Sequence, residues 1–345
     1  MIISRTPLRV SFFGGGTDYP DWFRDHHGAV LATTVDKYIY ISCRHLPPFF
    51  DHTLRISYSQ LEHVNTVDAI GHPSVRECLR FTGVDANLEV HTDADLPART
   101  GLGSSSAFTV GLLHVLHAYR GELATRQQLA AEATHVERDA IHESVGCQDQ
   151  ILAAYGGLNL VEFSADSTSV IPVPLKAARL EAFESHLMLF YSGIARHAST
   201  VAAQQLARLP ENRRTLSRMY DMVREGHALL VNAAWRDFGE LLHESWVLKR
   251  SLAASVSTGR IDEAYARARH AGAFGGKLLG AGGGGFLLVF ADPERQGAIR
   301  SALADLLPVP VGLDSTGSQI IFYQPNHGAE LAASGRRHGA LAYQR

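Results

Sequence analysis

The chain contains few cysteines, and these lie far apart. Three cysteines among 345 residues are odd in number, so the sequence has neither the framework of a disulfide-rich domain nor the paired spacing of a zinc knuckle. Eighteen histidines are present, but pairs such as His114 and His117 lack partner ligands, which predicts no histidine metal site. We expect reduced thiols, buried or near the surface, at Cys43, Cys78 and Cys147.

Long apolar runs are also missing. No segment approaches the roughly 20 apolar residues that a membrane-spanning helix needs. The N-terminus lacks the hydrophobic core of a signal peptide, because Arg5, Pro7 and Arg9 interrupt it. We therefore expect a cytoplasmic protein with no membrane partner.

No strong excess of charge of either sign is present. The formal net charge is -3, and acidic and basic residues are mixed along the chain, which argues against the basic face typical of a nucleic-acid binder. A length of 345 residues suits two domains that share a cleft, and 46% hydrophobic residues suffice for a core in each. These properties agree with a soluble metabolic enzyme that does not bind nucleic acid.

A turn rich in glycine and serine precedes a predicted helix. Residues 99–106 read Arg-Thr-Gly-Leu-Gly-Ser-Ser-Ser, and apolar residues then recur at helical spacing over 108–119. The first amide groups of such a helix are unsatisfied and its dipole is positive at this end, so a polyphosphate fits here. The serine hydroxyls can also reach phosphate oxygens or Mg²⁺. An ordinary serine-capped helix is the alternative. The expected phosphate-binding residues are Arg99, Gly101, Leu102, Gly103, Ser104, Ser105 and Ser106.

A second glycine-rich run, residues 280–285, formally matches the GxGxxG pattern of dinucleotide binding. The order of elements does not fit that pattern, because a predicted helix leads into the glycines and a predicted strand leaves them. The P-loop pattern also fails, since Leu278 follows Lys277 where Ser or Thr is required. We interpret the run as a loop whose backbone packs closely against another loop or a ligand. A hairpin or bulge that needs positive φ is the alternative.

Hydrophobic periodicity predicts a mixed order of strands and helices. Strands are expected at 2–13, 38–44, 54–58, 88–92, 158–163, 186–191, 286–291 and 320–323. Helices are expected at 105–120, 126–141, 147–154, 199–206, 212–234, 237–251 and 261–273. We place a domain boundary near residue 170, which gives domains 1–170 and 171–330 and a terminal extension at 331–345.

Three motifs are spread over nearly the whole chain. They are Pro7-Leu-Arg-Val-Ser-Phe-Phe-Gly-Gly-Gly-Thr-Asp18, the serine turn, and Lys277-Leu-Leu-Gly-Ala-Gly-Gly-Gly-Gly285. In this order they resemble the motifs of the GHMP kinases, the superfamily of galactokinase, homoserine kinase, mevalonate kinase and phosphomevalonate kinase. The resemblance implies an α+β, two-domain architecture with an N-terminal ribosomal-S5-like domain and a C-terminal ferredoxin-like domain. It also implies ATP and Mg²⁺ as cofactors.

The same resemblance implies catalytic roles. Asp149, in a Gly-x-x-Asp-Gln context, looks like the aspartate that faces the acceptor hydroxyl, and Arg9 looks like the cation that keeps it ionised. Glu137 and Ser105 look like the Mg²⁺ ligands. From the residues alone, other interpretations stay open, because an aspartate in a first turn simply favours the helix dipole and a glutamate in a polar helix is usually solvated.

The acceptor site is implied by the end of the first motif. Thr17-Asp18-Tyr19 resembles the sugar-binding Thr-Asp-Tyr of galactokinase, with Asp18 as the main sugar contact. Three glycines replace the Gly-Glu-His that galactokinase has just before it, and the loss of a carboxylate favours a phosphorylated sugar. Alternatively, the glycines serve only the backbone geometry. The expected acceptor-binding residues, including two cations for a distal phosphate, are Gly15, Gly16, Thr17, Asp18, Arg196, Lys249, Gly282 and Gly283.

Within the superfamily, the Gly-Gly-Gly-Thr-Asp form of the first motif looks most like that of the heptose 7-phosphate kinases. This implies an ATP-dependent kinase that phosphorylates the anomeric hydroxyl of D-glycero-D-manno-heptose 7-phosphate, in the synthesis of nucleotide-activated heptose for surface polysaccharide. Two alternatives are an anomeric kinase for an unphosphorylated sugar such as fucose or galactose, and a non-catalytic sensor of nucleotide and sugar. The expected partners are the sugar phosphate and ATP, with a homodimer as one option for assembly.

Overall fold

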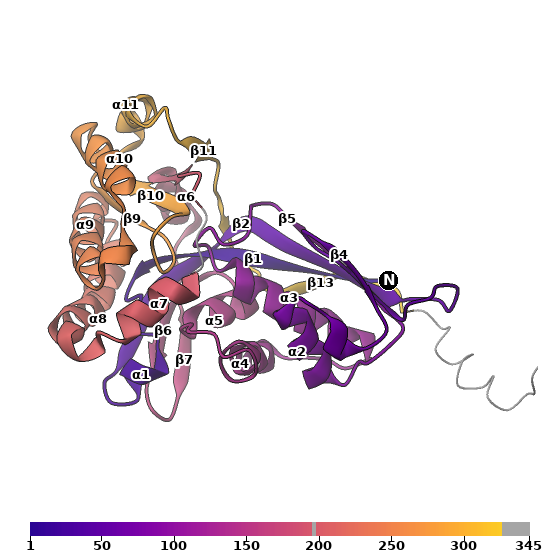
Figure 1. The fold of residues 1–345 in the computed structure, drawn as a ribbon. Helices are drawn as coiled ribbons and strands as arrows, with labels where there is room; N and C mark the ends of the chain where they lie inside the picture. Colours follow the sequence, from indigo (N-terminus) through magenta and orange to yellow (C-terminus); the bar gives the residue numbers. More distant parts are fainter. Residues whose placement is uncertain (195–197, 326–345) are drawn as a thin grey trace, which may run out of the picture.

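The computed structural model describes residues 1–194 and 198–325, which form two β-sheets and the helices packed on them (Figure 1). The larger sheet has the strand order β13-β1-β2-β5-β3-β4; β6 and β12 also pair with β2, and β7 pairs with β6. Its strands are β1 (Ile2–Phe13), β2 (Gly28–His45), β3 (Leu54–Ser57), β4 (Leu61–Val64), β5 (Leu88–Ala94), β6 (Leu158–Phe163), β7 (Thr168–Pro172), β12 (Leu313–Asp314) and β13 (Gln319–Tyr323).

The antiparallel pair of β1 and β2 is the centre of this sheet. Their register places Arg9 opposite Thr34, and residues 28–35 of β2 are all buried. A strand buried on both faces has no alternation of apolar and polar residues, so the sequence prediction found only its half-exposed part, 38–44. The strand predicted at 2–13 is confirmed as β1.

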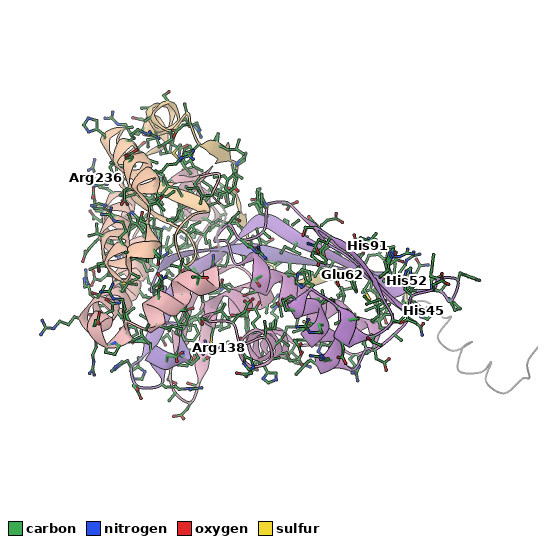
Figure 2. All side chains as sticks on the ribbon, viewed as in Figure 1. His45, His52, Glu62, His91, Arg138 and Arg236 are labelled. Carbon is green, nitrogen blue, oxygen red and sulfur yellow. The ribbon has the colours of Figure 1, made fainter. Side chains whose placement is uncertain are left out.

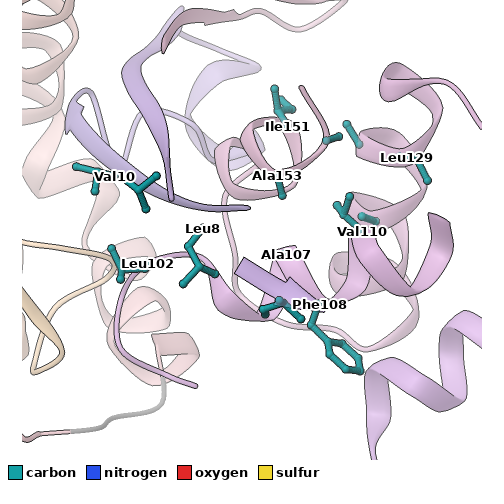
Figure 3. Packing of buried hydrophobic residues seen from close by; sticks show 14 of the residues in the cluster. Leu8, Val10, Leu102, Ala107, Phe108, Val110, Leu129, Ile151 and Ala153 are labelled. Carbon is teal, nitrogen blue, oxygen red and sulfur yellow. The ribbon is translucent and has the colours of Figure 1, made fainter. Parts of the chain in front are cut away.

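One face of the larger sheet is covered by helices (Figure 1). The helix α3 packs on β1 and β2, so Ala107 and Val110 of α3 share a core with Leu8 and Val10 of β1 and Ile151 of α5 (Figure 3). Because α3 is buried almost all round between the sheet and its neighbours, its position is fixed from several sides. The helices of this layer are α2 (Pro73–Thr82), α3 (Ser104–Tyr119), α4 (Arg126–His135) and α5 (Gln148–Tyr155).

The smaller sheet lies in the C-terminal half, with the antiparallel order β11-β8-β10-β9. Its strands are β8 (Leu187–Tyr191), β9 (Gly275–Leu278), β10 (Phe286–Phe290) and β11 (Leu307–Val309). A second core that contains Trp246 and Tyr265 joins this sheet to its helices. The helices of this half are α6 (Ala177–Ser185), α7 (Ala198–Leu206), α8 (Leu209–Val231), α9 (Trp235–Ser251), α10 (Gly259–His270) and α11 (Gln296–Ala302).

Several elements differ from the sequence prediction. The helix expected at 126–141 ends as α4 at His135 and continues as a π-helical turn, Val136–Ala140. The strand β9 was missed because Gly-Gly-Lys-Leu carries no strand pattern, and β4, β7, α2, α6 and α11 were also missed. The division of the chain near residue 170 stays a prediction; β7 spans that position, and β12 and β13 return from the C-terminal half to the larger sheet.

Candidate active site

A deep cleft lies between the N-terminal layer and the C-terminal elements. Its volume is about 1160 Å³, larger than the roughly 300–1,000 Å³ of a pocket for one small molecule. The cleft therefore has room for two ligands side by side. Most of the predicted site residues line it, namely Arg9, Gly15, Gly16, Asp18, Arg99, Gly101, Gly103, Ser104, Ser105, Ser106, Asp149 and Lys249.

The serine turn forms one wall of the cleft. Gly103 takes a left-handed φ of 73° at the N-cap of α3, and within the described residues no side chain caps the first turn of that helix. The first amide groups of α3 are therefore available to an anion in the cleft. The hydroxyl oxygen of Ser104 accepts a hydrogen bond from the backbone N–H of Arg99 (3.3 Å), which closes the turn on itself.

The glycine-rich loop packs directly on the serine turn. A Cβ at Gly280 would lie 2.5 Å from the Cα of Gly101, and one at Gly285 would lie 2.1 Å from the carbonyl oxygen of Thr100. The backbone N–H of Phe286 donates a hydrogen bond to the same carbonyl (3.1 Å). The sequence left open whether this loop packs against another loop or a ligand; the structure shows that it packs against another loop, the serine turn. The contact joins the two halves of the chain at the cleft.

Arg9 and Asp149 form an ion pair beside the serine turn, although 140 residues separate them in sequence. Nε and Nη2 of Arg9 donate to the two carboxylate oxygens of Asp149 at 2.7 and 2.6 Å, and Nη1 donates to the carbonyl of Gly101 at 2.7 Å. Arg9 is 5% exposed, so its orientation is fixed by β1 and by these three acceptors. The pair thus holds one carboxylate rigidly at the cleft surface, next to the proposed phosphate site.

Asp18 lies buried close to Asp149 and also lines the cleft. One carboxylate oxygen of Asp18 accepts from the backbone N–H of Gly16 (3.0 Å) and the other from that of Gln148 (3.4 Å). Burial raises the pKa of Asp18, and the negative charge of Asp149 adds to the rise. A buried carboxylate with amide donors on one side is well placed to accept hydrogen bonds from acceptor hydroxyls on the other.

Glu137 is fully buried behind the serine turn, within the π-helical turn that follows α4. Its carboxylate accepts from the hydroxyls of Ser106 (2.8 Å) and Thr109 (2.9 Å) and from the side-chain amide of Gln150. All three donors are neutral. Burial therefore raises the pKa of Glu137 to about 7, because the hydrogen bonds only partly offset the loss of solvation. The carboxylate is not part of the cleft surface, whereas Ser105 is exposed there.

Two predicted residues lie behind the cleft. The hydroxyl of Thr17 lies within hydrogen-bond distance of the carbonyls of Gly14 (2.8 Å) and Ala29 (2.9 Å), so it ties the first motif to the start of β2. Leu102 is fully buried in the core shown in Figure 3, and its carbonyl accepts from the backbone N–H of Arg9 (3.0 Å). Both residues hold the walls in place, and their roles as ligand contacts stay predictions.

Gly282 and Gly283 lie against Val256 and are not among the residues that line the described cleft. The backbone N–H of Gly283 donates to the carbonyl of Val256 (2.9 Å), and a Cβ at Gly282 would lie 2.5 Å from that oxygen. Arg196, the other cation predicted for a distal phosphate, lies outside the described residues.

The far end of the cleft is aromatic, which the sequence prediction missed. The rings of Tyr58 and His72 lie 4.8 Å apart, and those of His72 and Phe108 lie 4.9 Å apart. Glu62 fixes this wall by accepting from the hydroxyl of Tyr58 (2.9 Å) and from the backbone N–H of Gly71 (2.6 Å). Tyr58 follows β3, His72 caps α2 and Phe108 lies in α3, so these residues share no motif, and the sequence did not indicate that their rings meet.

Lys277 is a further cleft residue that the sequence prediction did not assign to the site. The sequence analysis named Lys277 only as the first residue of the third motif, and it did not predict the strand β9 that carries this residue. By contrast, His45, His52 and His91 lie at the end of the larger sheet away from the C-terminal helices (Figure 2). In the described part of the chain, no group of three or more potential ligands is arranged to hold a metal ion by itself.

Comparison with known families agrees with this geometry. The model of the GHMP kinases N terminal domain matches residues 70–157, and that of the GHMP kinases C terminal domain matches residues 227–309. The chain therefore belongs to the GHMP kinases and is a phosphotransferase. The α+β architecture and the family predicted from the three motifs are confirmed.

Relatives within the family include several sugar kinases. The chain is 28% identical over 316 residues to the D-glycero-alpha-D-manno-heptose 7-phosphate kinase of Campylobacter jejuni. This alignment covers 88% of this chain and 93% of the relative. It is 29% identical to the mevalonate kinase of Methanothermobacter thermautotrophicus over 68% of this chain and 78% of the relative.

Solved structures show the same fold. A D-glycero-D-manno-heptose 1-phosphate kinase from Bacteroides thetaiotaomicron superposes with a TM-score of 0.75 at 22% identity, over 92% of this chain and 98% of the other. A Lactococcus lactis galactokinase in complex with galactose gives a TM-score of 0.71 at 17% identity, over 93% and 95%. Within residues 1–194 and 198–325, no helix is long and apolar enough to span a bilayer.

Proposed function

We propose that this protein is an ATP-dependent sugar kinase whose acceptor is D-glycero-D-manno-heptose 7-phosphate. The observation that carries the proposal is the Arg9–Asp149 pair at the cleft surface beside the uncapped N-terminus of α3. A carboxylate fixed next to an anion site is the arrangement that transfer of a phosphoryl group to a hydroxyl requires.

The cleft gives each substrate a place. The triphosphate lies against the amide groups and hydroxyls of Ser104 and Ser105, with the base toward the aromatic end of the cleft. The acceptor lies against Asp18, with its hydroxyl at Asp149. The oxygen of this hydroxyl forms a bond to the terminal phosphorus while the bond from that phosphorus to the β-γ bridging oxygen breaks, giving ADP, and the proton of the hydroxyl is released to solvent.

Arg9 and Asp149 orient this step. Asp149 accepts the hydrogen bond of the hydroxyl and so directs its oxygen at the phosphorus. Arg9 holds both carboxylate oxygens of Asp149 and adds positive charge beside the transferring group. Since phosphoryl transfer passes through a loose transition state, positioning and charge contribute more than proton removal.

The family implies Glu137 and Ser105 as the residues for Mg²⁺; Ser105 lies at the cleft surface, and Glu137 lies behind it, hydrogen-bonded to Ser106 of the same turn. Glu137 is a buried carboxylate with only neutral donors and a pKa raised by burial, so a nearby cation would stabilise its ionised form. Ser105 adds an exposed hydroxyl from the first turn of α3. These residues would hold the ion, whose chemistry is to neutralise charge on the phosphates.

The heptose phosphate is favoured as acceptor by two independent facts. The relative from Campylobacter jejuni that aligns with most of this chain is named for that substrate. In addition, the first motif carries glycines at Gly15 and Gly16, both of which line the cleft, where galactokinase has acidic and imidazole side chains. The open space and the missing charge suit a longer, anionic sugar.

A coupled assay of ADP release tests the proposal. Heptose 7-phosphate, fucose and galactose are each offered with ATP and Mg²⁺, and ³¹P NMR of the product identifies the phosphorylated hydroxyl. We expect turnover of the heptose phosphate at its anomeric position and a loss of about 10²-fold or more in kcat for Asp149→Asn. Turnover of only a neutral sugar would refute the acceptor, and equal, negligible rates for the wild type and Asp149→Asn would favour a sensor.

A further inference from the structure

Lysine is rare in this chain, and its placement is uneven. The 32 basic residues counted as lysine or arginine include only four lysines, at Lys37, Lys176, Lys249 and Lys277. Two of them, Lys249 (6% exposed) and Lys277 (2% exposed), are buried and line the same cleft. A lysine is almost never buried without a partner, so two in one cavity wall indicate a specific role.

The hydrogen bonds of these two lysines leave donors unused. Nζ of Lys249 donates to the carbonyls of Leu278 (3.0 Å) and Gly280, and Nζ of Lys277 donates to the carbonyl of Phe12 (2.7 Å). A protonated amine has three N–H groups, so the pair retains three donors beyond those bonded to the described residues. Both residues line the cleft, so a ligand there would accept hydrogen bonds from the remaining donors.

The carboxylates nearby are already engaged. Asp149 is bound at both oxygens by Arg9, and Asp18 by backbone N–H groups, while the described ion pairs include none from either carboxylate to a lysine. Arg9, Lys249 and Lys277 thus lie near the two carboxylates Asp18 and Asp149 in this cleft. An anionic group on a ligand would complete this arrangement.

We propose that Lys249 and Lys277 form the binding site for the phosphate group that the acceptor sugar already carries. This deepens the proposed function and rests on it, since it assigns the selection of phosphorylated over neutral sugars to two residues. Both lysines interact electrostatically with Asp18, the expected sugar contact, and Lys249 also interacts with Asp149. Their proximity to Asp18 places the pair on the acceptor side of the cleft.

The choice of lysine over arginine fits such a site. Arginine stays charged in any environment, whereas a buried lysine can lose its proton when the cleft is empty and regain it when an anion binds. Burial lowers the pKa of Lys249 to about 7, and the charge of Arg9 adds to this shift. Burial also lowers the pKa of Lys277 well below its usual range, and the charges of Lys249 and Arg9 add to that shift. The charged groups that face Lys249 are Arg9 from β1, Asp18, Asp149 from α5 and Lys277 from β9.

The first experiment compares binding of heptose 7-phosphate and of unphosphorylated heptose by calorimetry, without nucleotide, so that it does not depend on turnover. The variants are Lys249→Met and Lys277→Met, and the matched control is Lys176→Met at an exposed lysine. We expect each buried substitution to weaken binding of the phosphorylated sugar about 10- to 100-fold, as for loss of a hydrogen bond to a charged group, and to affect the neutral sugar much less. An equal loss for both sugars would overturn the proposal.

Kinetics distinguish the acceptor phosphate from the transferred one. We expect the KM for heptose 7-phosphate to rise in Lys249→Met while the KM for ATP stays within about threefold, because the triphosphate lies on the serine turn. A fall in kcat with both KM values unchanged would mean that the lysines act on the transferring group, and would refute the proposal. If the wild type binds heptose 7-phosphate through these lysines but does not phosphorylate it, the proposed function fails and this inference stands.

A measurement on the wild type alone covers the case in which a buried substitution prevents folding. Binding enthalpies of heptose 7-phosphate at about pH 7.5, in buffers with different ionisation enthalpies, give the number of protons exchanged. We expect uptake of protons on binding, since an anion raises the pKa of both amines toward the ordinary lysine value. Absence of uptake, or uptake of equal size with the unphosphorylated sugar, would contradict a phosphate site at these lysines.

Discussion

Replacing Glu137 by glutamine removes a buried charge while keeping the shape of the side chain. Burial raises the pKa of Glu137 from 4.5 to about 7. One pKa unit corresponds to about 1.4 kcal/mol, so the ionised form lowers the free energy of unfolding by about 3 kcal/mol relative to the protonated form. The glutamine of the variant can still pair with Ser106, Thr109 and Gln150 by rotation of its amide group.

The sign of the pH dependence follows from the direction of the shift. Between pH 4.5 and about 7 the folded state binds more protons at Glu137 than the unfolded state does, so this residue lowers stability as the pH rises through that window. We expect the stability of Glu137→Gln, relative to the wild type, to increase by about 3 kcal/mol between about pH 5 and pH 8.

Urea unfolding in the presence of EDTA over this pH range measures the effect. The control is Glu181→Gln on α6, where an exposed carboxylate is replaced and no such change is expected. A second arm adds Mg²⁺ and ATP at about pH 8, where we expect ligand stabilisation of the wild type and little of Glu137→Gln. A constant difference between Glu137→Gln and the wild type at all pH values would refute the reasoning.

Three further predictions use the same contacts. Arg9→Lys keeps the charge but not the two-bond contact with Asp149. We therefore expect kcat to fall by about 10- to 100-fold while the melting temperature stays unchanged. Normal turnover would contradict the role of that geometry. Gly285→Ala places a Cβ 2.1 Å from the carbonyl oxygen of Thr100, at a φ of +99°. We expect this variant to lose about 2–4 kcal/mol of stability in denaturant unfolding. A loss below about 0.5 kcal/mol would show that the two loops separate easily. Burial lowers the pKa of His114 from 6.5 to about 4, so the wild type should lose up to about 3 kcal/mol as the pH falls through that window, and coincident acid-unfolding curves for His114→Gln would disprove this.

The local elements of the fold could be predicted where one pattern dominates. The N-terminal end of α3 followed from glycine and serine before an apolar helical run, and β1 followed from a long β-branched and aromatic segment. The elements that were missed are those whose surroundings decide them. Residues 28–35 of β2 are buried on both faces, and β9 is a strand only because β10 pairs with it.

For the site, the motifs named the residues but not their distances. Asp149 and Glu137 were both predicted as polar site residues, twelve positions apart in sequence. The structure places Asp149 at the cleft surface on Arg9 and Glu137 in the core behind the serine turn. Glu137 lies within the π-helical turn that follows α4, whereas Asp149 lies in the first turn of α5, and the sequence pattern did not indicate the π-helical turn.

The sequence by itself determined which chemical groups this protein has: a phosphate-binding turn, a carboxylate and a guanidinium in motifs of one family, and glycines that permit two loops to touch. These depend on residue type and on neighbours within a few positions, which the sequence specifies directly. Only the tertiary structure decided which groups meet and which are removed from water, because that depends on contacts between distant segments. It is this packing that leaves two of four lysines buried in the cleft and shifts the pKa of Lys249 to about 7.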